Sequence, residues 1–505
     1  MMDGIFLGVS TALTSYNIMM VVIGCFAGTF IGMLPGLGPI SAIALMIPIT
    51  YGMEPSSGLI LIAGVYYGAI FGGSTSSILI NAPGVAGTVA SSFDGYPMAK
   101  NGQAGKALAI AAYSSFSGGT IAAIFLLFAA PALAKVSLSF QSSDYFALMV
   151  LGLTAVAAFA GKGKFLKAAI MTIFGLMLAT VGIDADSGIA RFTFGRLDLI
   201  DGISFLLLAM AAFALSEAMM NILENKEQTQ KEKDELNESI GSLKITKEEV
   251  KEMVPTIGRS SVLGFFVGVL PGAGATIASF LAYGMERSFA SAKEKLKFGK
   301  GSIKGLAAPE SANNAACSGS FVPLLTLGIP GSGTTAIILG ALISYGIQPG
   351  PTMYVDNPAL FWSVIVSMYL GNLVLLILNL PLIPYIAKLL TLPKQLLLPL
   401  IIFFSLIGVY LVTFNNFDIY MMTLFAVVAI FLRIVDYPMA PMILGFILGG
   451  MMEDNLRRAL TISDGSLSFL WERPITFTIL IITVILLLMP LIGELRSKMK
   501  NGKES

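Results

Sequence analysis

The chain has 505 residues, of which 55% are hydrophobic and only 12% are charged. A soluble domain carries about 25% charged residues, so this composition excludes a water-soluble enzyme and indicates that lipid covers much of the surface. With no histidine, two cysteines (Cys25 and Cys317) and a net charge of +1, the chain gives no basis for a histidine zinc site, a Ser-His-Asp triad, a cysteine-rich metal site or nucleic-acid binding.

Apolar segments recur from one end of the chain to the other, and several are shorter than the roughly 20 residues that span a membrane. We expect them at 16–34, 38–51, 58–72, 107–130, 144–160, 165–182, 202–222, 256–270, 334–347, 360–387, 396–413, 418–432, 438–452 and 475–493. Proline and glycine interrupt the series near 35–39, 72–84, 271–274 and 319–333, which indicates broken or re-entrant helices. The sequence therefore predicts an all-α polytopic membrane protein with about 10–14 membrane segments. The first residues, MMDGIFLGVSTALTSYN, lack a basic region and a cleavage site, so we expect no removable signal peptide.

One strongly charged segment divides the chain. Residues 224–252 read ENKEQTQKEKDELNESIGSLKITKEEVKE, which predicts a solvated and partly helical linker. We expect a first membrane repeat at 1–223, a charged linker of cytoplasmic type at 224–255, the core of a second repeat at 256–390, and further membrane helices with a basic tail at 391–505. Basic residues also gather at 161–167, at 293–304 and in the tail, and the positive-inside rule places most of them in the cytoplasm.

Two glycine-proline motifs each occur twice, in the same order. The segments from Gly28 to Gly38 and from Gly264 to Gly274 both fit G-x-x-x-G-x-L-P-G-x-G, and they lie 236 positions apart. The segment from Gly72 to Gly84 has a counterpart 247 positions later, and a basic insert of about the right length lies between the motifs of the second half. The order and spacing indicate an internal duplication, and by analogy with other carriers we expect two inverted repeats.

Proline-glycine breaks at membrane depth are tolerated only where they are buried in protein or line a watery cavity. Helix N-termini at such breaks can hold anions, and free carbonyl and hydroxyl groups can ligate a cation such as Na⁺. The candidate substrate-binding and ion-binding residues therefore lie at and beside the breaks. In the first half they are Pro35, Gly36, Gly38, Ser74, Thr75, Ser76, Ser77, Asn81, Pro83 and Gly84, and in the second half Pro271, Gly272, Gly274, Thr276, Glu310, Asn313, Asn314, Pro330, Gly331, Ser332, Thr334 and Thr335.

The polar run AAPESANNAACSGS brings Glu310, Asn313 and Asn314 within about one helical turn. An acidic group at membrane depth is a functional candidate, so Glu310 can accept a proton, ligate a cation or orient Asn314. Alternatively, it lies at the water interface and caps the next helix, helped by the proline before it. Asp94 is followed by glycine and by a nearby proline, and we expect it in a loop turn.

The two repeats, the LPGxG breaks and the signature AAPESANNAACSGSFVPLLTLGIPGSGTTA together resemble the large membrane subunit of tripartite tricarboxylate transporters, the TctA family. The resemblance covers roughly residues 10–490 and marks all the candidates above except Thr276 and Thr335. It implies a bacterial or archaeal inner-membrane permease with a small membrane partner of the TctB type and an extracytoplasmic solute receptor of the TctC type. It also implies uptake of a carboxylate driven by an ion gradient, with Na⁺ or H⁺ as coupling ion and no other cofactor. The first half has a hydroxyl-rich STSS loop where the second half has FVPL, so we expect the halves to divide ion and substrate binding.

We therefore expect a carrier that works by alternating access, in which the paired breaks face each other near the midplane. The lack of a P-loop agrees with gradient-driven uptake, since the nearest match, KNGQAGKA, lacks the first glycine and the final hydroxyl. A passive anion channel is the main alternative. An intramembrane enzyme is a further one, but without histidine a serine nucleophile needs a lysine base, and the lysines lie mainly in loops and tails.

Overall fold

The computed structural model describes residues 2–34, 37–160, 163–184, 186–223, 240–272, 274–350, 352–388 and 394–501, and for residues 394–397 and 489–501 it describes the backbone alone. Within these ranges the regular structure is almost entirely helical, and one antiparallel pair of short strands forms the sheet. The fold is thus the all-α architecture that the sequence predicted.

The part before the linker begins with α1 (Met2–Ala12), α2 (Ser15–Met33), α3 (Gly38–Thr50), α4 (Pro55–Ile80), η1 (Ala86–Thr88), α5 (Val89–Met98), η2 (Ala99–Gln103), α6 (Ala104–Ser137), α7 (Ser142–Ala158) and α8 (Phe165–Ala179). A hairpin follows, in which β1 (Gly182–Ile183) pairs antiparallel with β2 (Ala190–Arg191) and Gly182 lies opposite Arg191. This part ends with η3 (Leu197–Leu199), α9 (Phe205–Ala209), η4 (Met210–Leu215) and α10 (Ser216–Leu223).

The part after the linker contains α12 (Lys247–Val269), α13 (Gly274–Phe289), α14 (Ala292–Lys295), α15 (Ile303–Gly319), α16 (Phe321–Leu327), α17 (Gly333–Ser344), α18 (Met353–Asp356), α19 (Pro358–Asn379) and α20 (Ile383–Ile386). The C-terminal helices are α21 (Lys394–Thr413), α22 (Asn416–Ile434), α23 (Met439–Ile462), α24 (Phe469–Glu472) and α25 (Pro474–Asn501). Most of these helices match predicted apolar segments.

Six helical stretches of the described chain are long and apolar enough to cross a membrane, and seven shorter apolar helices accompany them. The long stretches are Ser15–Met33, Pro55–Ile80, Ala86–Ser137, Phe205–Leu223, Pro358–Asn379 and Asn416–Ile434. Long and short apolar helices together agree with the predicted number of membrane segments, so the protein is a multi-pass membrane protein.

Local sequence signals explain where several helices begin. The hydroxyl of Thr14 accepts a hydrogen bond from the backbone N–H of Asn17 at the start of α2. The carboxylate of Glu54 does the same for Ser57 at the start of α4, where Pro55 occupies the first helical position. A capping box of Thr246 and Glu249 starts α12, so that residues 247–255, predicted as the end of the linker, are helical. The predicted linker residues 224–239 lie outside the described residues.

Two of the predicted breaks are shorter than expected. Helix α4 continues to Ile80, so residues 72–80 are helical and the hydroxyl-rich STSS run is not a loop. The hydroxyls of Ser76 and Ser77 donate to the carbonyl oxygen of Gly73 within the helix, which satisfies them without unwinding it. In the second half, α16 fills residues 321–327, which confines the break to the residues between α16 and α17.

Two of the helices that the sequence did not predict have polar residues that lower their local hydropathy. Helix α13 carries Glu286 and Arg287, and α15 carries the whole polar run around Glu310. Every residue from Gly305 to Gly319 is nevertheless buried. A buried helix with this many hydroxyl and amide groups is unusual, and it makes α15 the most informative element of the core.

Close backbone packing holds α2 against α4. A Cβ atom placed on Gly28 or Gly32 would meet the carbonyl oxygen of Val65 or Ala69 in α4, so only glycine fits at these two positions. Every residue of α4 from Ser56 to Ile78 is buried, which places this helix at the centre of the first half.

The same arrangement recurs between α12 and α15. A Cβ atom on Gly264 or Gly268 would meet the carbonyl oxygen of Ala312 or Ala316 in α15. The glycines lie 236 positions after Gly28 and Gly32, as in the sequence motif. The first repeated motif therefore makes the same kind of helix contact in each half.

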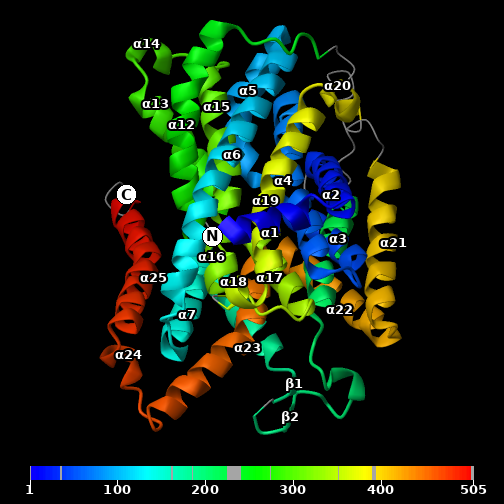
Figure 1. Cartoon of the computed structure of the whole chain (residues 1–505), viewed down its shortest axis with the longest axis vertical. Helices are drawn as coiled ribbons and strands as arrows, with labels where there is room; N and C mark the ends of the chain where they lie inside the picture. Colours follow the sequence, from blue (N-terminus) through cyan, green and yellow to red (C-terminus); the bar gives the residue numbers. More distant parts are fainter. Residues whose placement is uncertain are drawn as a thin grey trace.

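The molecule has two distinct ends (Figure 1). Helices α14 and α20 lie at one end, and the β1–β2 hairpin and α24 lie at the other. Residues Leu243 to Ile245, which belong to the predicted linker, line a surface hollow together with Leu380 and Pro381, just before α20. We call this the linker end and the opposite one the hairpin end.

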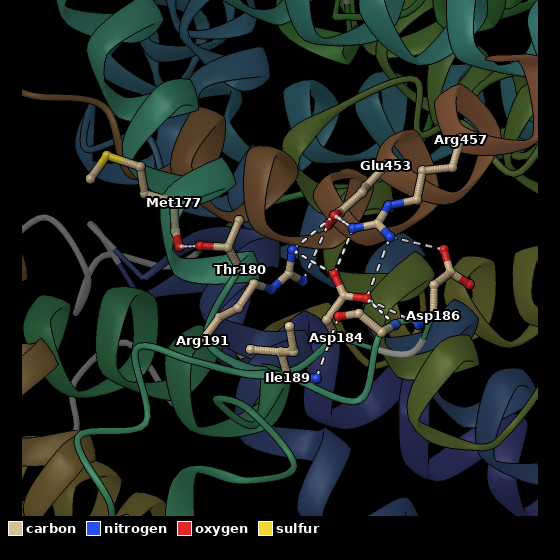
Figure 2. A network of polar contacts seen from close by, with 9 residues as sticks. Met177, Thr180, Asp184, Asp186, Ile189, Arg191, Glu453 and Arg457 are labelled. Atoms are coloured by element: carbon tan, nitrogen blue, oxygen red, sulfur yellow. Dashed lines mark hydrogen bonds and ion pairs between the residues drawn. The ribbon is translucent and has the colours of Figure 1, made fainter. Parts of the chain in front are cut away.

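An ion-pair network attaches the hairpin to α23 (Figure 2). The Asp184 carboxylate accepts hydrogen bonds from the backbone N–H groups of Asp186 and Ser187 and from Arg457. Glu453 in α23 pairs with Arg191 at 2.8 Å and with Arg457 at 2.6 Å. The backbone N–H of Ser187 lowers the pKa of Asp184, and the Arg191 guanidinium lowers the pKa of Glu453.

Replacing Arg457 by alanine is expected to loosen this hairpin. Amide hydrogen exchange of residues 182–191 should become about fivefold faster at pH 7, the scale set by partly exposed ion pairs. Because the pKa values of Asp184 and Glu453 are lowered in the folded protein, the network stabilises the hairpin above the usual carboxyl range of about 4 and is lost as the pH falls below it. The difference from wild type should therefore shrink at about pH 3. Arg196, which pairs with Asp198 and lies over the Phe417 ring but takes no part in the Asp184–Glu453 network, is the control. Equal exchange in Arg457→Ala and wild type at pH 7 would contradict the anchoring role.

Candidate functional site

Each half has two breaks along the chain, and the second break of the first half begins where α4 ends. Asn81 adopts a left-handed conformation with φ of 51°, and the backbone N–H of Ala82 donates to the Ser76 carbonyl. Pro83 and Gly84 follow, and a Cβ atom on Gly84 would collide with the carbonyl oxygen of Gly32 in α2. The chain therefore turns back against the end of α2, directly beside the other predicted break. Pro35 and Gly36, predicted for that break, lie outside the described residues.

The second break of the second half, 247 positions later, has the same geometry. Gly328 is left-handed with φ of 68°, and the N–H of Ile329 donates to the Pro323 carbonyl. After Pro330, a Cβ atom on Gly331 would lie 2.7 Å from the carbonyl oxygen of Gly268 in α12. The second repeated motif thus folds in the same way in both halves.

Within each half the two breaks touch each other. The N–H of Gly272 donates to the Gly331 carbonyl at 3.0 Å, and Gly274 packs on the side chain of Ser332. In the first half Gly38 packs near the carbonyl oxygen of Gly84. Pro271 and Gly272 are half-buried, with Gly272 against the backbone of α7, and Thr276 is half-buried on the first turn of α13.

The segments that follow the second breaks differ between the halves. In the second half Ser332 and Thr335 form a capping box that starts α17. In the first half Thr88 folds back onto α4, and its hydroxyl lies 2.7 Å from that of Ser77. The predicted residues Ser332, Thr334 and Thr335 therefore lie at a helix N-terminus. The hydroxyls of Ser76 and Ser77 instead form hydrogen bonds within the first half.

Each of these segments packs against the opposite half. Helix α17 contacts α3 and α4, and Gly333 lies near Ile40. The short helix η1 contacts α13 and α15, and Gly87 lies against the side-chain amide of Asn313. Both amide atoms of Asn313 lack a hydrogen-bond partner although the residue is fully buried. The breaks of one half thus lie on the helices of the other.

Glu310 forms a fully buried polar contact between the halves. Its Oε2 atom accepts hydrogen bonds of 2.8 Å from Ser74 in α4 and from Ser115 in α6. Ser91 of α5 lies close to the carboxyl group but forms no hydrogen bond with it. The first half therefore supplies three hydroxyls and the second half supplies the carboxyl group.

Burial decides between the two interpretations of Glu310. The residue is 0% exposed and lies inside α15, so the alternative of a helix cap at the water interface is wrong. It does not orient Asn314 with its side chain either, since the amide of Asn314 donates to the backbone carbonyl of Glu310. The Oε1 atom of Glu310 has no partner, and no lysine or arginine of the described chain pairs with the carboxyl group. An acid at this depth without a cationic partner must carry a proton or bind a cation.

Two site residues were not predicted. Ser115 lies in the run YSSFSGG of α6, where hydroxyls and glycines interrupt an apolar helix. The same combination of residues marked the predicted candidates of α4, so this pattern could have revealed Ser115. Asn379 is the last residue of α19 and lines a small cavity with Ser74, Thr75 and Ser115. No local pattern marks Asn379, because its place depends on how α19 packs against α4 and α6.

Groups of three or more histidine, cysteine, aspartate or glutamate side chains that could hold a transition metal are absent from the part of the chain that the structure describes. The two cysteines are buried and unpaired. The donors near Glu310 are hydroxyl, amide and carboxyl oxygens, which suit a proton or a hard cation.

A multi-pass helical protein with interrupted helices and a buried polar cluster between its halves belongs to the class of membrane transport proteins. The profile of the "Tripartite tricarboxylate transporter TctA family" matches residues 18–444, and the chain belongs to this family. It is therefore a membrane subunit of a tricarboxylate transporter, from a family of transporters rather than enzymes.

Two relatives from Agrobacterium vitis support this membership. The "uncharacterized 52.8 kDa protein in TAR-I ttuC' 3'region" is 43% identical over 492 residues, which is 97% of this chain and 96% of that protein. The "uncharacterized protein in TAR-II ttuC' 3'region" is 45% identical over 235 residues, which is 46% of this chain and 96% of the relative. No solved structure matches the chain.

Proposed function

We propose that the protein is the permease subunit of a receptor-dependent carrier that imports tricarboxylates or related carboxylates by alternating access. Transport is driven by an ion gradient, with Na⁺ or H⁺ as coupling ion and no other cofactor. The observation that carries this proposal is the Glu310 cluster, in which a buried acid of the second half is held by hydroxyls of the first half. Such a contact can couple ion binding to the relative position of the two halves.

The substrate carboxylates bind at the second breaks. Ser332, Thr334 and Thr335 gather at the N-terminus of α17, which is twelve residues long and presents free backbone N–H groups. On the other side the unpartnered Nδ2 of Asn313 supplies a buried donor next to Gly87. These groups can recognise carboxylates without a buried arginine, which fits the low charge of the membrane segments.

The repeated geometry supports alternating access. The second breaks of the two halves have the same backbone form, and the segments that follow them pack on helices of the opposite half. This supports two inverted repeats that rock or slide around a central site. Binding of both the ion and the substrate would neutralise the site, so that only the empty or fully loaded carrier moves.

The wider assembly comprises a small membrane subunit of the TctB type and an extracytoplasmic receptor of the TctC type that delivers the carboxylate. The protein lies in the inner membrane with the linker end in the cytoplasm, because the basic segment 293–304 contains α14, which is found at that end (Figure 1). Membership of the TctA family supports this arrangement.

Reconstitution tests the proposal. The permease and small subunit in proteoliposomes, with the receptor added outside, should accumulate one or more of a panel of labelled di- and tricarboxylates against a concentration gradient. Accumulation should require an inward gradient of Na⁺ or H⁺ and should stop when the gradient is collapsed by an ionophore. A current or flux that equilibrates the substrate without an ion gradient and without the receptor would instead identify a passive channel.

A further inference from the structure

A small cavity lies in the core beside the residues that hold Glu310. Ser74 and Thr75 of α4, Ser115 of α6 and Asn379 of α19 supply its polar lining, and apolar side chains close the rest. The space open to the centre of a water-sized sphere is about 10 Å³, which is enough for about one water molecule or one small ion. All four polar residues are nearly or fully buried.

Two oxygen atoms in or next to this cavity have no hydrogen-bond partner. The amide nitrogen of Asn379 donates to the Leu375 carbonyl at 3.0 Å, which fixes the amide orientation and leaves Oδ1 without a partner. The Oε1 atom of Glu310 is also unpartnered, while its Oε2 is bound by the two serines that line the cavity. A buried unpaired carbonyl oxygen and a buried unpaired carboxyl oxygen are both costly.

We propose that this cavity binds one Na⁺ ion, ligated by Asn379 Oδ1 and by the hydroxyls of Ser74 and Ser115, with the ionised Glu310 behind these two serines as its counter-charge. Oxygen donors of this kind suit a hard cation, and the ion supplies the positive charge that the buried carboxylate otherwise lacks. A proton on Glu310 would neutralise the acid but would leave Asn379 Oδ1 unpaired. The role of this ion as the coupling ion rests on the proposed transport function, whereas its binding does not.

The cavity lies a short distance from water at the linker end. Asn379 ends α19, and the next two residues, Leu380 and Pro381, line the surface hollow already described. On the facing helix, Ala112 lines the cavity and the adjacent Tyr113 lines the hollow. Sodium therefore enters or leaves the site between α6 and the end of α19.

Equilibrium binding of radioactive ²²Na⁺ to the purified full-length protein tests the site without substrate. Wild type should bind Na⁺ saturably, with Li⁺ as a competitor and K⁺ ineffective. Asn379→Ala should weaken binding by at least about tenfold, and Asn379→Asp should retain it, because a carboxylate oxygen replaces the amide oxygen. Asn372→Ala is the matched control, since Asn372 is also a buried, unpartnered amide of α19 but lies against Gly119 and does not line the cavity.

The outcomes separate the sodium site from the transport function. Saturable Na⁺ binding that Asn379→Ala weakens, in a protein that transports no carboxylate, would support the site and overturn the transport function. Carboxylate uptake driven by a pH gradient, without detectable Na⁺ binding, would overturn the site and leave the transport function intact. Equal Na⁺ binding in the Asn379→Ala and Asn372→Ala variants would also overturn the sodium site.

A thiol introduced by Leu380→Cys tests the route of entry. The two native cysteines are buried and unpaired, so a membrane-permeant thiol reagent should label the new position selectively. Bulky modification there should slow ²²Na⁺ association by about tenfold or more with little change in the equilibrium constant. Unchanged association rates in a fully modified protein would exclude entry between α6 and α19.

Discussion

Replacing Glu310 by glutamine is expected to reduce gradient-driven carboxylate accumulation by at least about 100-fold, because this change removes the buried acid while keeping its shape. The glutamine side chain can still accept the hydrogen bonds from Ser74 and Ser115, so the packing of α4, α6 and α15 should survive. It can neither carry the negative charge that balances a bound cation nor take up and release a proton at neutral pH. The measurement is uptake in proteoliposomes under a fixed ion gradient, with the amount of folded protein checked by gel filtration.

Two neighbouring serines of α6 provide a matched pair for this prediction. Ser115 donates to Glu310, whereas Ser114 is equally buried and has no partner. Ser115→Ala should therefore lower accumulation by about tenfold, the scale of one lost hydrogen bond to a charged group, and Ser114→Ala should have little effect. Wild-type accumulation in Glu310→Gln would show that the cluster is structural only and would remove the main support for ion coupling at this site.

The sequence predicted the positions of the helix interruptions more accurately than it predicted their lengths. The repeated proline-glycine motifs placed the breaks at Gly84 and Gly331 because glycine is required wherever the chain folds onto a carbonyl group of α2 or α12. The same reasoning assigned residues 72–80 to a loop, although serine and threonine hydroxyls can bond back to helix carbonyls at no cost to the helix. Composition alone does not distinguish a hydroxyl-rich loop from a hydroxyl-rich buried helix.

Only some residues of the candidate site could be predicted from the sequence. Glu310 was found because a carboxyl group in an apolar stretch is rare, and rarity is visible in a single sequence. Ser115 and Asn379 are ordinary in their local context, and they become part of the site through the packing of α6 and α19 against α4. Contacts between segments far apart in the chain leave no local pattern, which is also why the position of Asp94 was mispredicted.

Asp94 is a buried residue of α5 and not the loop residue that the sequence suggested. Its Oδ1 accepts four backbone hydrogen bonds, from Gly299, Lys300, Gly301 and Ser302, at 2.7 to 3.2 Å. Consecutive N–H groups that converge on one oxygen form a concave anion site in the turn that precedes α15. The carboxylate thus fastens α5 of the first half to the start of the helix that carries Glu310.

Replacing Asp94 by asparagine should therefore destabilise the protein by about 2–4 kcal/mol, because the four N–H groups lose a charged acceptor in a buried place. The new amide nitrogen would also face Gly305, where a Cβ atom would collide with Oδ2, and the hydroxyl of Tyr283, which now donates to Oδ2 at 3.1 Å. The apparent midpoint of thermal unfolding of the purified protein should fall by about 5 °C or more. Asp198→Asn, at a partly exposed residue of the hairpin end, should leave the midpoint unchanged and serves as the control.

The position of Asp94 also bears on transport. Since α5 and α15 belong to different halves, any motion that separates them must break the four backbone hydrogen bonds to its carboxylate. Asp94→Asn should then lower uptake even at temperatures where the variant is folded, in proportion to the time that the halves spend apart. A variant that keeps both the wild-type unfolding midpoint and the wild-type uptake would show that the turn before α15 holds its shape without the carboxylate, and that the two halves are fastened elsewhere.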